Sequence, residues 1–364
     1  MRVEVCAPGK LVLLGEYAVL EGAPAIVMAV NRYALVIIEN SRENYSIVDA
    51  PDINISNAAF TLTSAGYFSL VRPVSQYDTK KLHFFFSTLQ YALDELANKI
   101  SEPPLLNFNL DTADFFEKRN GAKLGLGSSA ALTVALISAL FKAVDPAFNI
   151  RANRNYLFES SLHAHRSAQA NIGSGIDIAA SVFGGYISYQ LDAVTSKPVT
   201  LEQLTLPENL YILPVWSGKS ASTRELVMKY NRFKAENPDE FGKMVTEMTA
   251  IAQKGCEAFK NGNVLKVLDE VNNYFMALKK LGEACKAPIV SPLHQQLAKI
   301  VHRGGGVYKP SGAGAADIGL AFCDSPDKAE IIKNRLSKEG FRILTLQPDY
   351  DGVKSITGGE NPNG

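Results

Sequence analysis

The sequence predicts an α+β protein in two domains, and three observations support that prediction. The chain has 364 residues, which is longer than one ordinary hydrophobic core favours. Its N-terminal part is rich in short apolar and alternating runs, which favour strands. Its C-terminal part combines long amphipathic stretches with a final strand–helix–strand pattern, typical of helices packed on an antiparallel sheet. The polar stretch Asp192–Pro198 is the predicted link between the domains.

Composition excludes several classes of protein. Hydrophobic residues make up 46% of the chain and charged residues 20%, as in ordinary soluble domains. The 37 basic and 37 acidic residues cancel, so we expect no nucleic-acid partner and no membrane partner. The four cysteines are scattered without C-x-x-C spacing and predict buried thiols in a reducing compartment. Charges interrupt the apolar N-terminus, so we expect no signal peptide and a cytoplasmic protein.

Periodicity and turn signals place the elements of the first half. Alternating apolar runs predict the strands, and apolar residues three or four apart predict the helices. A Pro-Gly turn at 7–10 carries Lys10 between two short strands. The predicted elements are, in order, strands at 2–6, 11–14, 25–38, 45–48, 60–62, a helix at 82–100, a strand at 105–110, and helices at 128–144 and 151–170.

The second half repeats these signals with longer helices. A short helix at 178–181 and a strand at 185–190 precede the predicted link. After the link, the predicted elements are a strand at 210–215, helices at 224–236, 239–261, 263–285 and 290–303, a strand at 318–323, a helix at 327–338 and a strand at 341–346. We predict domains at 1–192 and 199–357, with 358–364 as a flexible tail.

The glycine-rich stretch 121–132 is the main candidate for a binding site. Gly125 and Gly127 permit a tight turn, and Ser128 and Ser129 are good N-cap residues for the helix that follows. Amide groups at a helix N-terminus point toward one spot at the positive end of the helix dipole, which suits a phosphate. The alternative is a tight serine-capped loop without a ligand.

Two other phosphate-binding patterns fit this stretch less well. A Walker loop needs a Gly-Lys-Ser/Thr ending, which the stretch does not have. The spacing Gly125-x-Gly127-x-x-Ala130 does match the alanine form of the dinucleotide fingerprint, with Asp145 near the required distance. That acid should end a second strand, whereas Asp145-Pro146 ends the predicted helix. We therefore do not favour a dinucleotide site.

Two further glycine-rich turns, at 171–177 and 309–317, carry chemical groups of their own. Asp177 could accept a proton from an alcohol or hold a neighbouring lysine; the alternative is a helix N-cap. Lys10 could reach a phosphoryl group, or it could be a solvated surface lysine. Phosphoryl transfer needs amides and cations around the phosphates, a magnesium ion and a group that orients the acceptor.

Two other groups of side chains have simpler interpretations. His163 and His165 would face different directions on a helix, which favours surface or packing residues over a metal site. The run Phe84-Phe85-Phe86 is expected in the core rather than as a base-stacking platform.

Three motifs resemble those of the GHMP kinases. Ala7–Leu20 is similar to the first motif of that superfamily, Gly125–Ala131 to its ATP-binding second motif and Ser311–Asp317 to its third. Within the superfamily, the residues around Gly173–Asp177 and Lys219–Thr223 resemble the phosphomevalonate kinases. The motifs spread over almost the whole chain.

The resemblance implies a two-domain fold with a ferredoxin-like C-terminal domain, and a nucleotide in the cleft between the domains. It also implies ATP and Mg²⁺ as cofactors, phosphomevalonate or a related small molecule as substrate, and a monomer or homodimer. Lys10 and Asp177 would be catalytic. The ATP phosphates would contact Gly125, Leu126, Gly127, Ser128, Ser129 and Ala130, with Ser128 and Ser129 at the metal. The substrate would contact Glu16, Tyr17, Ser174, Gly175, Lys219, Ser220, Arg224, Ser311, Gly312 and Ala313.

The resemblance leaves two other functions open. A mevalonate kinase or another GHMP kinase would phosphorylate an alcohol or a sugar phosphate instead of a phosphate acceptor. A protein of a different class would bind a metabolite as a sensor without catalysis. The presence of Lys10, Ser128, Ser129 and Asp177 argues for an enzyme.

Overall fold

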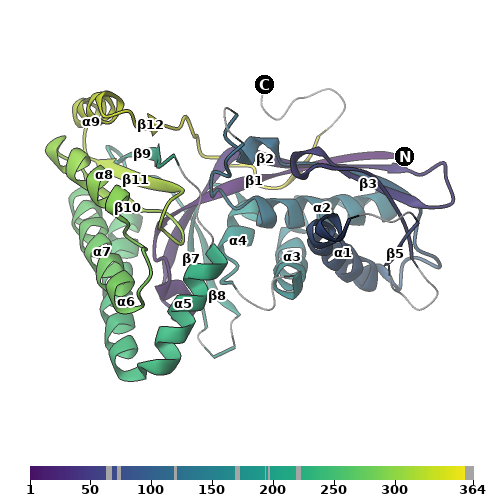
Figure 1. The fold of residues 1–364 in the computed structure, drawn as a ribbon, viewed down its shortest axis with the longest axis horizontal. Coiled ribbons are helices and arrows are strands. Elements are labelled where there is room, and N and C mark those ends of the chain that lie inside the picture. The colour runs from purple at the N-terminus through teal and green to yellow at the C-terminus, as the bar shows by residue number, and fades with distance from the viewer. Residues whose placement is uncertain are drawn as a thin grey trace.

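The structure is a computed structural model of the chain. It describes residues 1–62, 68–71, 75–118, 121–168, 173–192, 194–195, 197–218 and 223–356. The described residues form two β-sheets with helices packed against them (Figure 1). This arrangement is the predicted mixture of helices and antiparallel strands. None of the helices within those ranges is long and apolar enough to cross a membrane.

Among the described residues, the larger sheet contains nine strands: seven follow the order β13-β1-β2-β6-β3-β4-β5, β7 pairs with β2, and β8 pairs with β7. Its centre is the long antiparallel pair β1 and β2, and among the described strands only β3 and β6 pair in parallel. The bounds are β1 Arg2–Leu14, β2 Ala25–Asn40, β3 Ser46–Ala50, β4 Ile55–Leu62, β5 Phe68–Leu70, β6 Leu106–Asp111, β7 Tyr186–Leu191, β8 Pro198–Leu204 and β13 Lys354–Ser355.

Four helices cover one face of this sheet (Figure 1). They are α1 Gln76–Leu96, α2 Ser128–Val144, α3 Arg154–Ala168 and α4 Ile176–Phe183. The helix α2 is almost entirely buried between β1, β2 and the neighbouring helices, because its residues are apolar or small on nearly every side. Short 3₁₀ helices lie at η1 Ala18–Glu21, η2 Pro51–Ile53 and η3 Ala113–Phe115.

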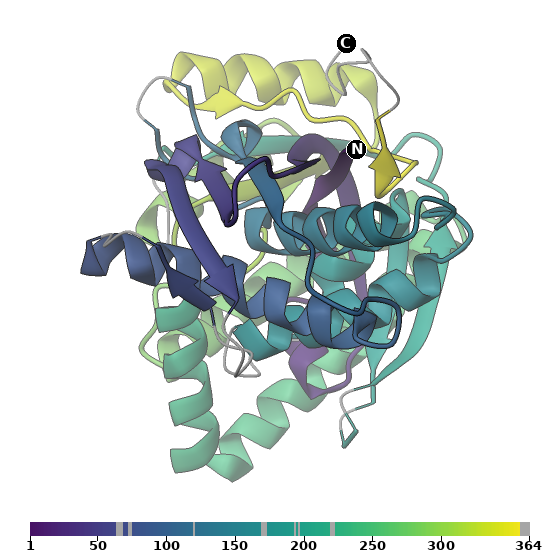
Figure 2. The same ribbon diagram turned by 90° about the vertical axis from the view of Figure 1, so that its right-hand side faces the viewer.

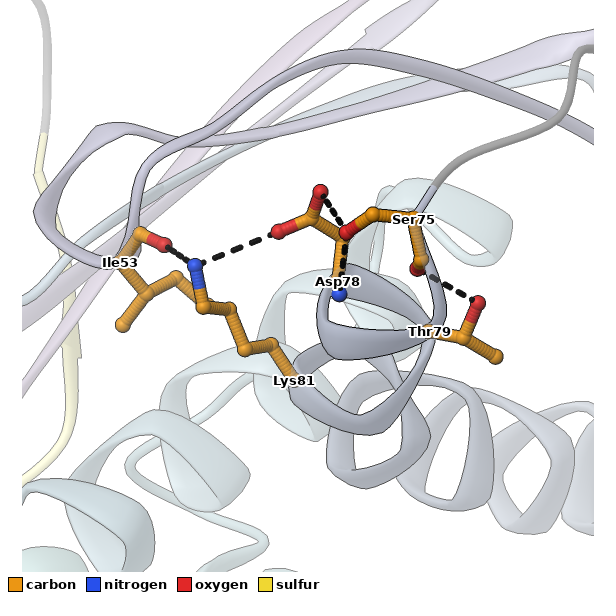
Figure 3. A network of polar contacts seen from close by, with 5 residues as sticks. All are labelled: Ile53, Ser75, Asp78, Thr79 and Lys81. Atoms are coloured by element: carbon orange, nitrogen blue, oxygen red, sulfur yellow. Dashed lines mark hydrogen bonds and ion pairs between the residues drawn. The ribbon is translucent and has the colours of Figure 1, made fainter.

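Helix α1 begins six residues earlier than the apolar pattern predicts, because a polar network forms at its start (Figure 3). The Oγ atom of Ser75 accepts a hydrogen bond from the amide of Asp78 at 3.1 Å and donates one to the Asp78 carboxylate at 2.6 Å. Lys81 pairs with Asp78 and donates to the carbonyl of Ile53 in η2. This capping arrangement satisfies the first turn and ties the helix to the sheet.

The smaller sheet has four antiparallel strands in the order β10-β11-β9-β12. Its chain path is β-α-β-β-α-β, the connectivity of ferredoxin-like units, with four helices in the first connection. The bounds are β9 Tyr211–Trp216, α5 Thr223–Glu236, α6 Pro238–Lys260, α7 Val264–Ala284, α8 Pro292–Arg303, β10 Val307–Pro310, β11 Ile318–Cys323, α9 Pro326–Lys338 and β12 Arg342–Ile343.

After β12 the chain returns to the larger sheet, as Figure 2 shows in yellow. There β13 pairs with β1 at Val5 and Cys6. The hydroxyl of Tyr33 on β2 donates to the buried carboxylate of Asp349 at 2.6 Å. The predicted division near 192–199 stays a prediction, and two strands beyond it, β8 and β13, hydrogen-bond within the larger sheet.

The predicted turn at 7–10 is wrong, because β1 runs through it as one strand. The register with β2 shifts between Pro8 and Gly9, so the Pro-Gly signal marks a bulge. A Cβ atom on Gly9 would lie 2.7 Å from the carbonyl oxygen of Leu126 and 2.7 Å from the ring of Phe115. Glycine is needed at this position because the glycine-rich loop comes that close to the strand.

The four cysteines are free and buried, as the scattered spacing predicts. The run Phe84-Phe85-Phe86 also contributes to packing, with Phe85 buried in the core and Phe86 stacked on Phe68 at a ring separation of 5.0 Å.

Candidate active site

The glycine-rich loop 125–130 of the second motif, called the second loop here, forms the N-terminal end of α2, and the loop 311–317 of the third motif is called the third loop. Gly125 and Gly127 have φ values of 77° and 81°, in the left-handed region that favours glycine. The N-cap of α2 is Gly127, and Ser128 is already the first helical residue. The prediction that a serine caps this helix is therefore wrong. Because the first-turn amides of a helix have no intrahelical acceptor, those of Ser128, Ser129 and Ala130 can still bind an anion.

Lys10 lies directly against this loop. Its backbone amide donates to the carbonyl of Leu126 at 2.8 Å. A Cβ atom on Gly127 would lie 3.1 Å from Cγ and 3.2 Å from Cε of Lys10, so the lysine stem runs past the helix N-cap. A Cβ atom on Gly312 would lie 3.7 Å from the Lys10 ammonium. The ammonium of Lys10 therefore lies where the second and third loops meet.

A second cation, Lys123, and a carboxylate, Asp317, lie at the same junction, and neither was predicted as a site residue. A Cβ atom on Gly125 would lie 2.6 Å from Cγ of Asp317, so the second and third loops touch there. The surrounding protein desolvates the ammonium of Lys123, although part of that side chain is exposed, and this lowers its pKa. Asp317 opposes the shift, and the nearby charge of Lys10 adds to it. The motif letters did mark Asp317, but nothing in the spacing marked Lys123.

Glu16 and Lys309 form a buried ion pair beside this junction. Both side chains are almost inaccessible to solvent, and the Lys309 ammonium contacts Oε1 of Glu16. Burial raises the pKa of Glu16 and lowers the pKa of Lys309, and the charge of Lys10 lowers the latter further. The carboxylate of Glu16 holds Lys309 in place, and its predicted contact with substrate stays a prediction.

Three residues predicted to bind substrate hold the third loop against the larger sheet. The Tyr17 hydroxyl donates to the carbonyl of Ala313 at 2.6 Å. The hydroxyl of Ser311 accepts from the amide of Val12 and donates to its carbonyl, both at 3.0 Å. The loop is thereby fixed beside β1, two residues from Lys10.

His294 supports the third loop through the carbonyl of Ala316 and was not selected from the sequence. It is fully buried, and burial lowers its pKa to about 4, so the ring is neutral at pH 7. Nδ1 lies 2.8 Å from the Tyr308 hydroxyl, and Nε2 lies 3.0 Å from the carbonyl of Ala316. Since a carbonyl can only accept, Nε2 carries the proton and donates, while Nδ1 accepts from the tyrosine.

His165 reaches the second loop from α3. Its Nε2 lies 3.3 Å from the Oγ atom of Ser129, and its ring packs edge-on against Phe84. His165 is buried, as a packing residue would be, whereas His163 is exposed and stacks on Tyr91. Sequence reasoning missed the contact with Ser129, because it depends on how α3 packs against α2.

Asp177 lies in the first turn of α4, whose N-cap is Gly175 with φ 83°. One carboxylate oxygen accepts from the amide of Ile178 at 3.0 Å. The carbonyl of Ser174 accepts from the Tyr189 hydroxyl at 2.7 Å, which fixes the turn. At the other end of α4, Ser181 donates to the carbonyl of Pro8 at 2.7 Å. The helix that carries Asp177 is thus anchored to β1 at Pro8, two residues before Lys10. A pairing of Asp177 with Lys10 stays a prediction.

Three predicted substrate contacts cannot be placed. Lys219 and Ser220 lie outside the described residues, and so does the side chain of Arg224. The candidate site described here therefore consists of Lys10, Lys123, Gly312, Asp317 and the loop 125–130, and Asp177 stays a predicted member.

The loop fits a magnesium nucleotide. A site for phosphate needs close backbone approach, and Gly125 and Gly127 provide it where a side chain would collide. The described residues contain no group of three or more His, Cys, Asp or Glu side chains that could hold a metal alone. Mg²⁺ needs no such cage, since it keeps several waters and binds one or two protein oxygens together with phosphates. The hydroxyls of Ser128 and Ser129 are suitable oxygens.

Comparison with known proteins identifies the class. Residues 87–185 match the family model of the GHMP kinases N terminal domain, a range that includes the second glycine-rich loop and Asp177. This part of the chain is therefore similar to the N-terminal domain of the GHMP kinases, a class of ATP-dependent phosphotransferases.

Relatives that align over nearly the whole chain include phosphomevalonate kinases and mevalonate kinases. The chain is 26% identical to a phosphomevalonate kinase from Streptomyces sp. (strain CL190), over 95% of this chain and 97% of that protein. It is also 26% identical to a mevalonate kinase from Pyrococcus furiosus, over 97% and 98% of the two chains. The fold matches that of Streptococcus pneumoniae phosphomevalonate kinase in complex with phosphomevalonate and AMPPNP, with a TM-score of 0.75, 20% identity and coverage of 96% and 100%.

Proposed function

We propose that this protein transfers the γ-phosphoryl group of MgATP to 5-phosphomevalonate, which yields 5-diphosphomevalonate and ADP. An oxygen of the substrate's phosphate attacks the γ-phosphorus. The bond from that phosphorus to the β–γ bridging oxygen breaks, and ADP leaves with the electron pair. Any proton on the attacking phosphate passes to solvent. The observation that carries this proposal is the position of the Lys10 ammonium between the second and third glycine-rich loops.

The electrostatics of the site suit this reaction. A phosphate monoester has a second pKa of roughly 6, so at neutral pH the acceptor is largely a dianion and needs little help from a base. The larger difficulty is the repulsion between two anions, which cations at the reacting group reduce. Lys10 and Lys123 are two such cations, and the amides of α2 would hold the nucleotide's phosphates. Bound Mg²⁺ would neutralise further charge on the phosphate oxygens.

The remaining roles follow from position. Asp177 would orient Lys10 or the acceptor, and Lys219 and Arg224 would hold the substrate's own phosphate. Lys309 and Glu16 would fix the floor of the site beside Lys10. We further propose that the protein acts in the cytoplasm, as a monomer or homodimer.

The first test is an acceptor screen with purified protein and MgATP. Mevalonate, 5-phosphomevalonate and phosphorylated sugars are compared by kcat/KM, and 5-phosphomevalonate should be the preferred acceptor. A preference for mevalonate would replace this proposal with a mevalonate kinase. Tight metabolite binding without ATP turnover for every acceptor would instead favour a sensor.

Two substitutions test the assigned roles. Lys10→Met should lower kcat by about a hundredfold to a thousandfold, the usual cost of losing one group that stabilises transition-state charge. Asp177→Asn should be much milder with a phosphate acceptor, because no strong base is required. Lys243→Met, at an exposed position on α6, is the control. A Lys10→Met protein with unchanged kcat would remove Lys10 from the catalytic residues.

A further inference from the structure

A cavity of about 430 Å³ lies far from the candidate active site. It is lined by the last turn of α2, the connection to α3, the first residue of α3 and the C-terminal segment around β13. Between Ser128, at the start of α2, and Lys142, in this cavity, there are fourteen helical steps, which span about 21 Å at 1.5 Å per residue. The cavity and the phosphate loop therefore lie at opposite ends of the same helix.

The lining is strongly basic. Four cations, Lys142, Arg151, Arg154 and Lys354, face one carboxylate, that of Asp351. Lys354 pairs with Asp351 at 3.0 Å, which leaves the other three cations without a carboxylate partner in the lining. Burial lowers the pKa of Arg154, and repulsion from the nearby Arg151 guanidinium adds to this shift, whereas Asp351 and Asp349 oppose it.

Two polar atoms of the lining are buried and have no hydrogen-bond partner among the described residues. They are Nε of Arg154 and Oγ of Ser355. Another nitrogen of Arg154 donates to the carbonyl of Asp351, which holds the guanidinium in place. A buried donor without a partner is unfavourable, and an anion in the cavity would offset the positive charge around it and relieve the repulsion between the arginines.

We propose that this cavity is a second binding site, specific for the phosphate group of a small phosphorylated molecule. Arg151 and Arg154 present planar guanidinium groups, which bind phosphate through two parallel hydrogen bonds. The volume suits a small molecule rather than a macromolecule. The adjacent N-terminus of α3 adds the positive end of a helix dipole.

Two helices, α2 and α3, connect this cavity with the candidate active site. Lys142 belongs to α2, which begins at the phosphate loop, and Arg154 belongs to α3, whose His165 contacts Ser129. None of the lining residues belongs to the candidate active site, so the second site does not depend on the proposed reaction.

Calorimetric titration of the full chain tests this proposal, first without and then with a saturating non-hydrolysable ATP analogue. Inorganic diphosphate and glycerol 3-phosphate serve as the two probes. Tighter binding of glycerol 3-phosphate would show that its glycerol part also contacts the cavity. We expect diphosphate binding that persists with the analogue and weakens about tenfold, a loss of 1.4 kcal/mol, in Arg151→Gln. Lys142→Gln should weaken it in the same direction.

Lys243→Gln removes one exposed positive charge from α6 and is the matched control, which should bind diphosphate as the unchanged protein does. Diphosphate binding that the ATP analogue abolishes would overturn the proposal, because it would place the anion in the active site. An equal loss of binding in Arg151→Gln and Lys243→Gln would overturn it too, since only general charge attraction would remain.

Discussion

Glu16 and Lys309 are two residues whose charges depend on each other. Both are buried beside Lys10, and one oxygen of Glu16 has no hydrogen-bond partner among the described residues. Removal of one partner leaves an uncompensated buried charge, which costs about 3–5 kcal/mol. Glu16→Leu or Lys309→Met should therefore destabilise the protein strongly in urea unfolding. The double variant Glu16→Leu with Lys309→Met should recover most of that loss. If the double variant lost as much as both single changes added together, the two charges would be independent.

His294 makes the stability of the protein depend on pH. Its folded pKa is about 4, below the ordinary value of 6.5, so between these values the unfolded chain binds more protons. The His294 contribution is therefore complete above pH 6.5 and is lost as the pH falls toward 4. Between pH 7 and pH 5 the loss is about 2 kcal/mol. Urea unfolding of the protein and of His294→Gln at both pH values isolates this contribution. An identical pH dependence in the two proteins would contradict it.

At the scale of single elements, the second and third glycine-rich loops are pressed together at Gly125. A Cβ atom there would lie 2.6 Å from Asp317, whereas a Cβ atom on Gly121 would meet no atom within 4 Å. Both glycines have positive φ values, 77° and 67°, so alanine carries a similar backbone strain at either position, about 1–2 kcal/mol. Gly125→Ala should in addition push the loops apart and raise the KM for ATP.

Gly121→Ala is the matched control for that prediction. It should lower the free energy of unfolding but leave the KM for ATP unchanged. Equal KM values in the two variants would show that contact between the loops does not matter for the nucleotide.

Local sequence signals predicted most of these elements but not their contacts. Apolar periodicity placed α2 at 128–144, with the observed ends, because that helix is long and bounded by Gly127 and Asp145. The same reasoning divided β1 in two, since Pro8-Gly9 is a turn signal whether the chain turns or bulges. Lys123 was missed as part of the site, and His165 and His294 as residues that support its loops, because each reaches the loops through the packing of distant segments. Lys10 and Gly312 were both found because they lie within motifs.

At the scale of the whole molecule, the two sheets should unfold together. The chain leaves the larger sheet after β8, builds the smaller one and returns to pair β13 with β1. The ion pair of Arg342 with the buried Glu117 and the Tyr17–Ala313 hydrogen bond also join the two sheets. Trp216, the single tryptophan, lies in β9 and reports on the smaller sheet. Its fluorescence and the far-UV circular dichroism should therefore give the same unfolding midpoint in urea.

A chain that ends at Leu346 provides the comparison. It lacks β13 and the Tyr33–Asp349 hydrogen bond, so the tryptophan signal and the circular dichroism should give two different midpoints. Separate midpoints in the full chain would show that the returning segment does not couple the sheets.

The pairing of β13 with β1 also bears on how the protein is made. During translation β1 emerges from the ribosome before every other strand, yet the segment that covers its outer edge emerges after all of them. Until then, the backbone of the nascent chain at Val5 and Cys6 offers an open edge to which another polypeptide could attach. The larger sheet can therefore be completed only after Lys354 and Ser355 have been synthesised.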